Sequence, residues 1–349
     1  MLKNGEYKKN LGIYKSMKKF KFKNLISIFL GCACIVICIL FSFIKISEKS
    51  LTSKVGYKAV ITIWQIDTFD GGTGSRTAFL RNITNEYHKK HQEVLFLVIN
   101  HTVESANAAF LKNKIPDIIS YGNCNLEISK FAREICDTKE NDGGVINGKR
   151  YAMPWLKGCY FYITHANQKI EEVKNSFVVD NENYSGALPL LAQNLKVANP
   201  IFLNSKESLI RFKADKNSAL IGTQRDIVRL QNQEISFNAE PLTEFCDLYQ
   251  YASITTTSDE KVSFAISFLN YLTSFEVQKK IKNLKMFSII NAVNYDDDEW
   301  LNKGQNITHN YTLSPFISSE HSKDIKNQAK ESVLKDYGRE EVIKLLKQL

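Results

Sequence analysis

The chain has 349 residues, is 44% apolar and 24% charged, and contains only 6 prolines and 16 glycines. Apolar surface on this scale has to be buried, which excludes a disordered, collagen-like or low-complexity protein. The formal net charge is +9, but residues 1–23 hold eight lysines against a single acid, Glu6, and carry +7 of it. The remaining 326 residues carry only +2, so the basic isoelectric point is no evidence for nucleic-acid binding, and no nucleic-acid partner is expected.

The basic tail, residues 1–23, is followed by 21 uncharged residues, 24–44, with the sequence NLISIFLGCACIVICILFSFI. As a helix this segment would be about 31 Å long, which matches the hydrocarbon core of a bilayer. Lysines are dense before the segment and sparse after it, so the positive-inside rule places the tail in the cytoplasm. We therefore expect one N-terminal transmembrane helix, a single-pass location in the cell membrane, and a main domain on the extracytoplasmic side.

Two other fates of this segment are cleavage as a signal peptide and lipidation. A cleaved signal peptide has an apolar region of only about 7–15 residues and a small-residue cleavage site, and Ser42-Phe43-Ile44 is a poor one. Phe29-Leu30-Gly31-Cys32 loosely resembles a lipoprotein signal, in which Cys32 would be lipidated. Lipidation there would leave twelve apolar residues on the mature terminus, where a polar tether is expected. An uncleaved anchor is the favoured hypothesis, and a lipid anchor at Cys32 is the alternative.

Four cysteines lie beyond the anchor, at positions 124, 136, 159 and 246, far apart and without CxxC spacing. An even number outside the cell permits disulfides, but the spacing identifies no pair. Four small buried thiols are the favoured interpretation.

The outer part begins with a polar tether, residues 45–57, followed by a strand rich in β-branched residues, 59–66. A glycine-rich turn, residues 70–74, follows, and Ser75 is placed to cap a helix. The next segment, 94–99, is apolar throughout, as expected for a strand buried on both faces. Strand, helix and strand within about 40 residues predict an α/β fold with a parallel sheet. The apolar face expected for the helix is Phe79, Leu80, Ile83 and Tyr87.

Further elements follow the same signals. Residues 115–120 and 286–293 are predicted to be strands, 151–164 an extended aromatic segment, and 320–349 a helix interrupted near Gly338. A capping box from Thr257 to Glu260 predicts the start of one helix, and Ser274 that of the next.

The sequence offers little support for catalysis. The turn Gly72-Thr73-Gly74 lacks the third glycine of a dinucleotide fingerprint and the lysine of a phosphate loop. His88 and His91 lack further ligands at metal spacing, residues 296–299 lack the alternation of a calcium loop, and no G-x-S-x-G occurs. We expect no enzyme, no cofactor and no metal. The glycine turn either contributes to a ligand site at the end of the first strand or only connects two elements.

Aromatic side chains beside carboxylates are the stronger signal. A stacking face next to carboxylates that accept hydrogen bonds from hydroxyls is typical of sugar binding. Each aromatic taken singly is more often a core residue, but their clustering at expected strand ends favours a binding site. The residues are Trp64, Phe69, Tyr121, Trp155, Tyr160, Tyr162 and Trp300, near Asp67, Asp70 and Asp117.

Four segments resemble the extracellular solute-binding proteins of ABC importers, specifically the carbohydrate-binding family 1 group. Residues 111–122 (LKNKIPDIISYG) resemble its G-x-x-P-D-[IV]-[IV] strand, and 148–167 its G-K-x-Y-A-x-P-W segment and the strand after it. Residues 216–230 resemble its G-K-x-A-M strand and glycine turn, and 243–278 its F-x-x-Y-L-T-S-x-x-x-Q helix pair. Together these segments span most of residues 57–295 in the family's order.

The resemblance implies a two-lobed α/β fold of the type II periplasmic-binding-protein kind, in residues 58–349, with a hinge. Lobe 1 would comprise about 58–158 and 248–288, and lobe 2 about 165–240 and 293–349, with crossings near 154–164, 241–251 and 288–293. Matching the family's motifs makes Asp117 and Trp155 the first candidates for ligand contacts. The other candidates are Asp67, Phe69 and Asp70 after the first strand, Tyr160, and Thr223, Gln224 and Arg225 at the glycine turn.

The function so implied is a membrane-anchored receptor that delivers a sugar or oligosaccharide to ABC permease subunits by hinge closure. The short second lobe and the permanent anchor, which both depart from the family pattern, support an alternative, a sensor or adaptor with a vestigial cleft. Gln224 also stands where the family has an aromatic residue, so one stacking surface is absent. A surface carbohydrate-active enzyme would need a carboxylate pair at catalytic separation, and the sequence indicates none.

Overall fold

The computed structural model describes residues 58–137, 143–336 and 338–348, which belong to one compact unit formed by residues 57–349. The basic tail, the expected membrane segment 24–44 and the tether lie outside the described residues. Within the described ranges, no helix is both long enough and apolar enough to cross a membrane.

The first of two five-stranded sheets has the strand order β2-β1-β3-β13-β7. β1 (Ala59–Ile66) pairs in parallel with β2 (Val94–His101) and with β3 (Ile118–Tyr121). β13 (Tyr249–Ile254) runs antiparallel to both β3 and β7 (Met153–Lys157). The predicted parallel strand–helix–strand unit is confirmed. The predicted burial of 94–99 on both faces is wrong, because β2 forms the edge of the sheet and leaves Leu97 52% exposed.

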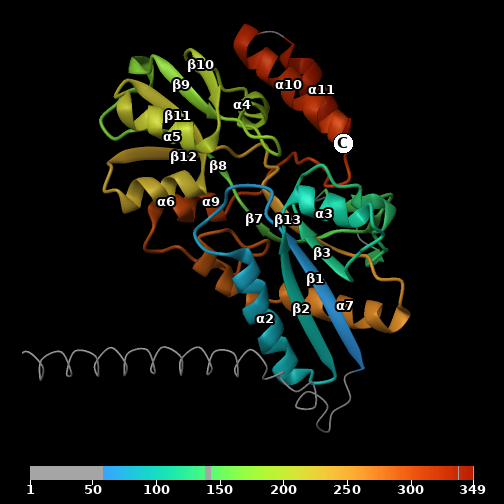
Figure 1. The fold of residues 1–349 in the computed structure, drawn as a ribbon. Helices are drawn as coiled ribbons and strands as arrows, with labels where there is room; N and C mark the ends of the chain where they lie inside the picture. Colours follow the sequence, from blue (N-terminus) through green and yellow to red (C-terminus); the bar gives the residue numbers. More distant parts are fainter. Residues whose placement is uncertain (1–57, 138–142, 337, 349) are drawn as a thin grey trace, which may run out of the picture. The chain divides into compact units, whose positions relative to one another are not determined.

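Helices cover both faces of this sheet (Figure 1). α2 (Arg76–Lys90) and α7 (Asp259–Leu272) pack on the face that carries Ile61 and Ile63, and α3 (Val103–Phe110) lies on the face of Trp64 and Ile66. Ser75 caps α2 as predicted, since its Oγ accepts a 3.1 Å hydrogen bond from the Ala78 amide. Side chains on the two faces of β1 therefore pack into two separate hydrophobic cores.

The second sheet has the order β10-β9-β11-β8-β12. It contains β8 (Tyr160–His165), β9 (Asn175–Val179), β10 (Pro200–Leu203), β11 (Ser218–Thr223) and β12 (Phe237–Pro241). Although this part of the chain is short, its sheet has five strands, as many as the first sheet. The helices that pack against it or against each other are α4 (Ala187–Ala192), α5 (Ser205–Ala214), α6 (Gln224–Asn232), α10 (Ser319–Lys335) and α11 (Arg339–Gln348).

The remaining elements are short. They are η2 (Ile128–Lys130), β4 (Cys136–Asp137), β5 (Val145–Ile146), β6 (Lys149–Arg150), η3 (Ile170–Glu172), α8 (Phe275–Gln278), η4 (Lys279–Leu284) and α9 (Glu299–Gln305). The interruption near Gly338 is confirmed by the break between α10 and α11. The capping box is wrong, because α7 begins at Asp259 with Ser258 as its N-cap. The strand predicted over 286–293 is also wrong: only Phe287 forms a bridge, to Lys157.

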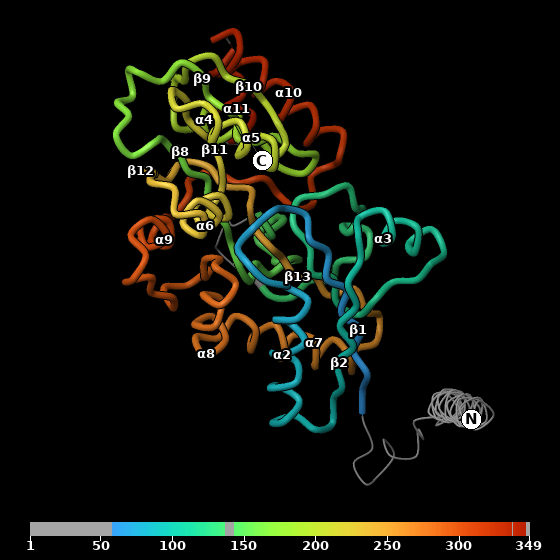
Figure 2. The backbone as a smooth tube through the Cα atoms, turned by 60° about the vertical axis from the view of Figure 1, so that its left-hand side comes forward, coloured from blue at the N-terminus to red at the C-terminus, as the bar shows by residue number. Residues whose placement is uncertain are grey.

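Three segments of chain connect the two sheets and lie side by side where they cross. β7 continues into β8 through Gly158 and Cys159, and the amide of Gly158 donates a 2.6 Å hydrogen bond to Leu248, between β12 and β13. The amide of Lys157 donates to Phe287, at 2.9 Å, on the third segment. Figure 2 shows β13 near the centre of the view, with α6 and α9 next to each other on its left-hand side. Each sheet with its helices is hereafter called a lobe.

Candidate functional site

A cavity of about 340 Å³ lies where loops of the two lobes meet. Cys124 and Asn125, from the loop after β3, line one side, and residues 180–183, from the loop after β9, line another. Both loops follow the carboxyl ends of parallel strands, where ligands bind in open α/β sheets. The volume is at the lower end of the range for small-molecule sites. The other lining residues are Ile317, Ser319, Ser322, Lys323, Lys326, Asn327 and Lys330, from α10 and the segment before it.

Beside the cavity, hydrogen bonds connect polar groups from both lobes and from the crossing segments. The Asn183 side chain donates to the carbonyl of Thr68 at 3.1 Å. The Asn123 side chain donates to the carbonyl of Asp247 at 3.5 Å, and the Tyr160 hydroxyl donates to Asp247 Oδ1 at 2.7 Å. These five residues, hereafter the polar cluster, come from the loops after β1, β3 and β9, from β8, and from the chain before β13.

Three buried atoms of the polar cluster have no hydrogen-bond partner among the described residues. They are Thr68 Oγ1, Asn123 Oδ1 and Asp247 Oδ2. A buried polar atom without a partner is unfavourable in free energy, and such atoms in native structures call for a specific explanation. A bound polar molecule that supplies hydrogen bonds to them would provide one.

The charged groups around the cavity are mutually compensated. Burial raises the pKa of Asp247 to about 6. Burial also lowers the pKa of Lys326, although Asp247 and Asp180 act in the opposite direction, and its Nζ donates to the carbonyl of Glu182 at 3.0 Å. Lys330 forms a 2.9 Å ion pair with Asp180. The cavity is therefore polar without a dominant sign of charge.

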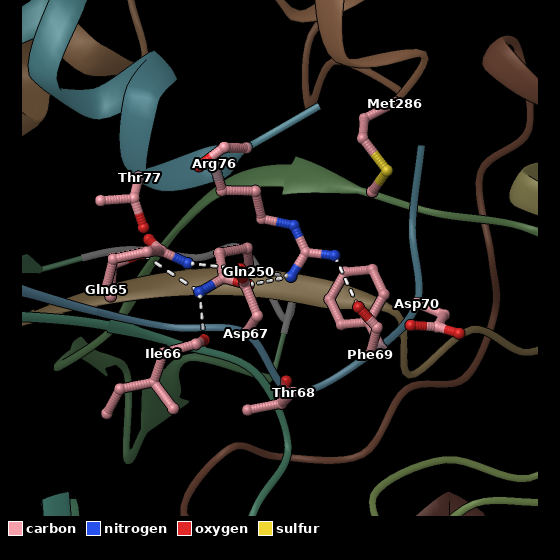
Figure 3. A network of polar contacts seen from close by, with 12 residues as sticks. Gln65, Ile66, Asp67, Thr68, Phe69, Asp70, Arg76, Thr77, Gln250 and Met286 are labelled. Atoms are coloured by element: carbon pink, nitrogen blue, oxygen red, sulfur yellow. Dashed lines mark hydrogen bonds and ion pairs between the residues drawn. The ribbon is translucent and has the colours of Figure 1, made fainter. Parts of the chain in front are cut away.

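Next to this cluster, the loop after β1 is organised by Arg76 (Figure 3). Arg76 is 4% exposed, and its guanidinium donates to Asp67 Oδ1 at 3.1 Å, to Gln250 Oε1 at 3.1 Å and to the carbonyl of Phe69 at 2.7 Å. The same guanidinium lies 4.2 Å from the centroid of the Phe69 ring. Asp67 and Phe69, both predicted as ligand contacts, thus have a partner inside their own lobe.

Asp70, Thr223 and Arg225, three further predicted residues, are brought together across the lobes. Arg225 forms a 3.3 Å ion pair with Asp70 Oδ1, and Arg229 lies 3.9 Å from Asp70 Oδ2. The Thr223 hydroxyl donates to the carbonyl of Asp70 at 3.4 Å. The first turn of α6 therefore contacts the loop after β1 directly.

Gln224 and Tyr160 are fully buried near the crossings of the chain. Gln224 Oε1 accepts a 2.9 Å hydrogen bond from the Cys159 amide, and its Nε2 lies 2.9 Å from Met286 Sδ. The side chain thereby links two crossing segments. Tyr160 belongs to the polar cluster through its hydroxyl.

The structure places Trp155 in the core instead of at the cavity. Its side chain is fully buried, stacks on Phe79 with centroids 5.8 Å apart, and donates from Nε1 to Ser120 Oγ at 3.0 Å. Because β7 is the strand next to β13 under α2, its central aromatic fills the space between sheet and helix. Trp155 presents no free ring face to a ligand here.

Asp117 lies at the opposite end of its strand from the cavity. It immediately precedes β3, whereas the cavity lies beyond the carboxyl end of that strand. Its carboxylate accepts hydrogen bonds from the Thr62 amide at 2.8 Å and from Lys261 Nζ at 3.0 Å. Burial alone would raise the pKa of Asp117, but these hydrogen bonds outweigh it and the pKa is lowered. Asp117 therefore links β1, which contains Thr62, to α7, which contains Lys261. A proline–aspartate pair that immediately precedes a strand places the carboxylate at the amino end of that strand.

Sequence reasoning missed Thr68, Asn123, Asn183 and Asp247 of the polar cluster. The available signals were the polar residues 180–185 and the ends of the predicted strands at residues 66 and 120. Asp247 had no local signal, since it lies in a segment of irregular structure between two strands.

The glycine turn has a packing role. Gly72 has φ +64°, and a Cβ there would lie 1.8 Å from the carbonyl oxygen of Leu284, to which the Thr73 amide donates at 2.7 Å.

In the ranges that the structure describes, no group of three or more His, Cys, Asp or Glu side chains could hold a metal ion. Cys159 and Cys246 are buried free thiols, whereas Cys124 is partly exposed and Cys136 exposed, so the expectation of four buried thiols holds for only two of them.

No family model and no curated protein matches the sequence. Among solved structures, the maltodextrin-binding protein MalE1 from L. casei BL23 matches with a TM-score of 0.57 at 11% identity, over 83% of this chain and 96% of that one. A family 1 extracellular solute-binding protein from Bifidobacterium longum subsp. infantis matches with a TM-score of 0.57 at 13% identity, over 83% and 98%. The GacH receptor of Streptomyces glaucescens GLA.O, solved without ligand and with acarbose, matches with a TM-score of 0.52 at 14% identity, over 83% and 96%.

These likenesses establish the fold. The described residues have the two-lobed α/β fold of extracellular solute-binding proteins, as the sequence resemblance implied. The structures named here are binding proteins and receptors, not enzymes.

Proposed function

We propose that residues 58–349 are a non-catalytic extracytoplasmic receptor for a small, hydroxyl-rich solute of the carbohydrate class, bound between the lobes. The observation that carries this proposal is the polar cluster beside the 340 Å³ cavity, with three buried atoms that lack partners among the described residues. A sugar hydroxyl both donates and accepts hydrogen bonds, so one ligand class can satisfy Thr68, Asn123 and Asp247 together.

Recognition would depend on hydrogen bonds more than on stacking. Trp155 is buried in the core, and Phe69 is 7% exposed with Arg76 over its ring. A cavity of this volume suits a short carbohydrate better than a long one. The matched structures include a maltodextrin-binding protein and a receptor solved with acarbose, which supports this ligand class.

The proposed mechanism is closure about the three crossing segments. The groups proposed to contact the ligand come from both lobes, Thr68 and Asn123 from one and Asn183 from the other. A ligand that bridges them would favour the form in which the lobes meet. We further propose that residues 24–44 anchor the receptor in the cell membrane and that it delivers its ligand to the permease subunits of an ABC transporter. Mass spectrometry of the mature N-terminus tests the anchor, and a lipid-modified Cys32 as first residue would contradict an uncleaved helix.

Calorimetry with a panel of mono- and disaccharides tests ligand binding. Asn123→Ala is expected to weaken binding about tenfold through loss of a hydrogen bond. Asn238→Ala, at an exposed amide of β12 that does not line the cavity, is the matched control. Equal affinity in both variants would remove the polar cluster from the site, and no binding of any sugar would refute the ligand class.

A second candidate is a sensor or adaptor with a vestigial cleft. The observation that favours it is the direct contact of Asp70 with Arg225 and Arg229, which joins the lobes through protein groups alone. Purification from membranes under mild detergent distinguishes the two. Co-purification with a membrane partner other than a permease, together with failure to bind any solute, would favour the sensor.

A further inference from the structure

A strip of basic residues lies on the surface of the first lobe. It shares no residue with the polar cluster. On α8 and η4, Phe275 is 58% exposed, and Lys279 and Lys282 are exposed one and two turns further along. The Lys279 ammonium lies 5.4 Å from the centroid of the Phe275 ring. The inner face of the same segment is buried through Val277, Gln278, Ile281 and Leu284.

The strip continues onto the end of α2. Lys90 forms a 3.4 Å ion pair with Glu276 and lies 5.7 Å from the centroid of Tyr271, so the last turn of α2 adjoins α8. Lys89, next to it, is exposed. Lys280 pairs with Glu86 of α2, which fixes the two segments side by side.

The strip meets the point where the described chain begins. Lys58 is exposed, and its amide donates to the carbonyl of Glu93 at 2.8 Å, in the short connection that follows α2. Residue 58 lies 14 positions after the end of the expected membrane segment at residue 44. Even fully extended, that length of chain spans at most about 50 Å, so an anchor at residues 24–44, as proposed above, would limit the distance of residue 58 from the bilayer to this length.

The charge of the strip contrasts with that of its domain. Residues 58–349 contain 35 lysines and arginines and 35 aspartates and glutamates, a net charge of zero. The strip holds Lys58, Lys89, Lys90, Lys279, Lys280 and Lys282 against Glu86, Glu93 and Glu276, a net charge of +3. Lysines flanking an exposed aromatic side chain on one face of a short helical segment are typical of surfaces that bind at the membrane interface.

We propose that this strip binds the anionic phospholipid headgroups of the membrane in which residues 24–44 are proposed to anchor the chain. The lysines supply the electrostatic attraction, and Phe275 inserts between headgroups. Tethering keeps the strip near the bilayer, so that weak individual contacts suffice. This proposal rests on the anchor proposed for residues 24–44 and is independent of which solute the receptor binds.

The test uses the full chain in lipid nanodiscs made either of phosphatidylcholine alone or of phosphatidylcholine with phosphatidylglycerol. Limited acylation with an amine-reactive reagent, read by mass spectrometry, gives a labelling rate for each lysine. Lys279 and Lys282 are expected to label at least about fivefold more slowly in the anionic discs, and high salt should abolish the difference. Lys216, exposed on the second lobe, is the internal control and should label equally in both.

The matched variants are Lys279→Gln with Lys282→Gln, and Lys213→Gln with Lys216→Gln. The first pair is expected to restore rapid labelling of Lys89 in anionic discs, and the second pair to leave its protection unchanged. Equal rates for Lys279 in the two kinds of disc would overturn the proposal. If both rates were slow, they would indicate a contact with protein instead of lipid. Neither result would affect solute binding measured by calorimetry.

Discussion

The hydroxyl of Tyr160 donates a 2.7 Å hydrogen bond to the carboxylate of Asp247, at the position where the chain crosses between the lobes. Tyr160 begins β8 in the second lobe, and Asp247 lies in the segment that returns to β13 in the first. Both side chains are buried, and the second carboxylate oxygen has no partner among the described residues. The pair therefore joins two of the crossing segments within the polar cluster.

The pH dependence of stability tests the burial of Asp247. Its pKa of about 6 in the folded chain lies above the ordinary aspartate value, so the folded form binds an extra proton between about pH 4 and pH 6. The free energy of unfolding, relative to that of Asp247→Asn, should fall by up to about 3 kcal/mol as the pH rises through this window. Urea unfolding at several pH values measures it, with exposed Asp297→Asn as control. A pH-independent difference would show that Asp247 titrates normally.

Arg225→Gln tests the direct contact between the lobes. Because Arg225 and Asp70 are both partly exposed, the pair contributes at most about 1 kcal/mol, which corresponds to a fivefold change in the ratio of open to closed forms. Small-angle scattering without ligand should give a larger radius of gyration for this variant. Arg211→Gln, which loses an exposed pair within α5, should not change it. Identical curves for both variants would mean that Asp70 does not hold the lobes together.

Trp155→Ala tests whether Trp155 is a core residue or a ligand contact. Loss of the buried indole, which stacks on Phe79 and donates to Ser120, should lower the free energy of unfolding by about 3–5 kcal/mol. Trp155→Phe keeps most of the packing and should retain the affinity for ligand. Chemical denaturation and calorimetry measure the two effects. A stable Trp155→Ala variant with weakened binding would instead place the indole in the site.

Asp117→Asn should destabilise the fold and leave binding unchanged. The carboxylate accepts charge-assisted hydrogen bonds, and their loss should cost about 1.5–3 kcal/mol. Since the folded chain lowers the pKa of Asp117, this stability is present above the ordinary pKa and is lost as the pH falls through the folded value. Unfolding measured at acidic and neutral pH should show the difference from Asp117→Asn only at neutral pH. Unchanged stability with reduced affinity would make Asp117 a ligand contact.

The local elements of this fold could be predicted because the signals for them lie within a few neighbouring residues. The β-branched run 59–66, the cap at Ser75 and the apolar stripe of the helix after it predicted β1 and α2, and the break near Gly338 predicted the separation of α10 from α11. The charge separation between residues 1–23 and the rest of the chain was likewise readable without a structure.

Where the side chains of the site lie was decided only by tertiary structure. Asp117 and Trp155 matched motifs, yet one lies at the amino end of its strand and the other under a helix, because strand direction and sheet order determine which end meets the cavity. The groups that do meet there are far apart in sequence: Asn183 and Thr68 are separated by 115 positions, and Asn123 and Asp247 by 124. Periodicity and capping act over one or two turns of chain, whereas a site between lobes depends on contacts made only when the whole domain has folded.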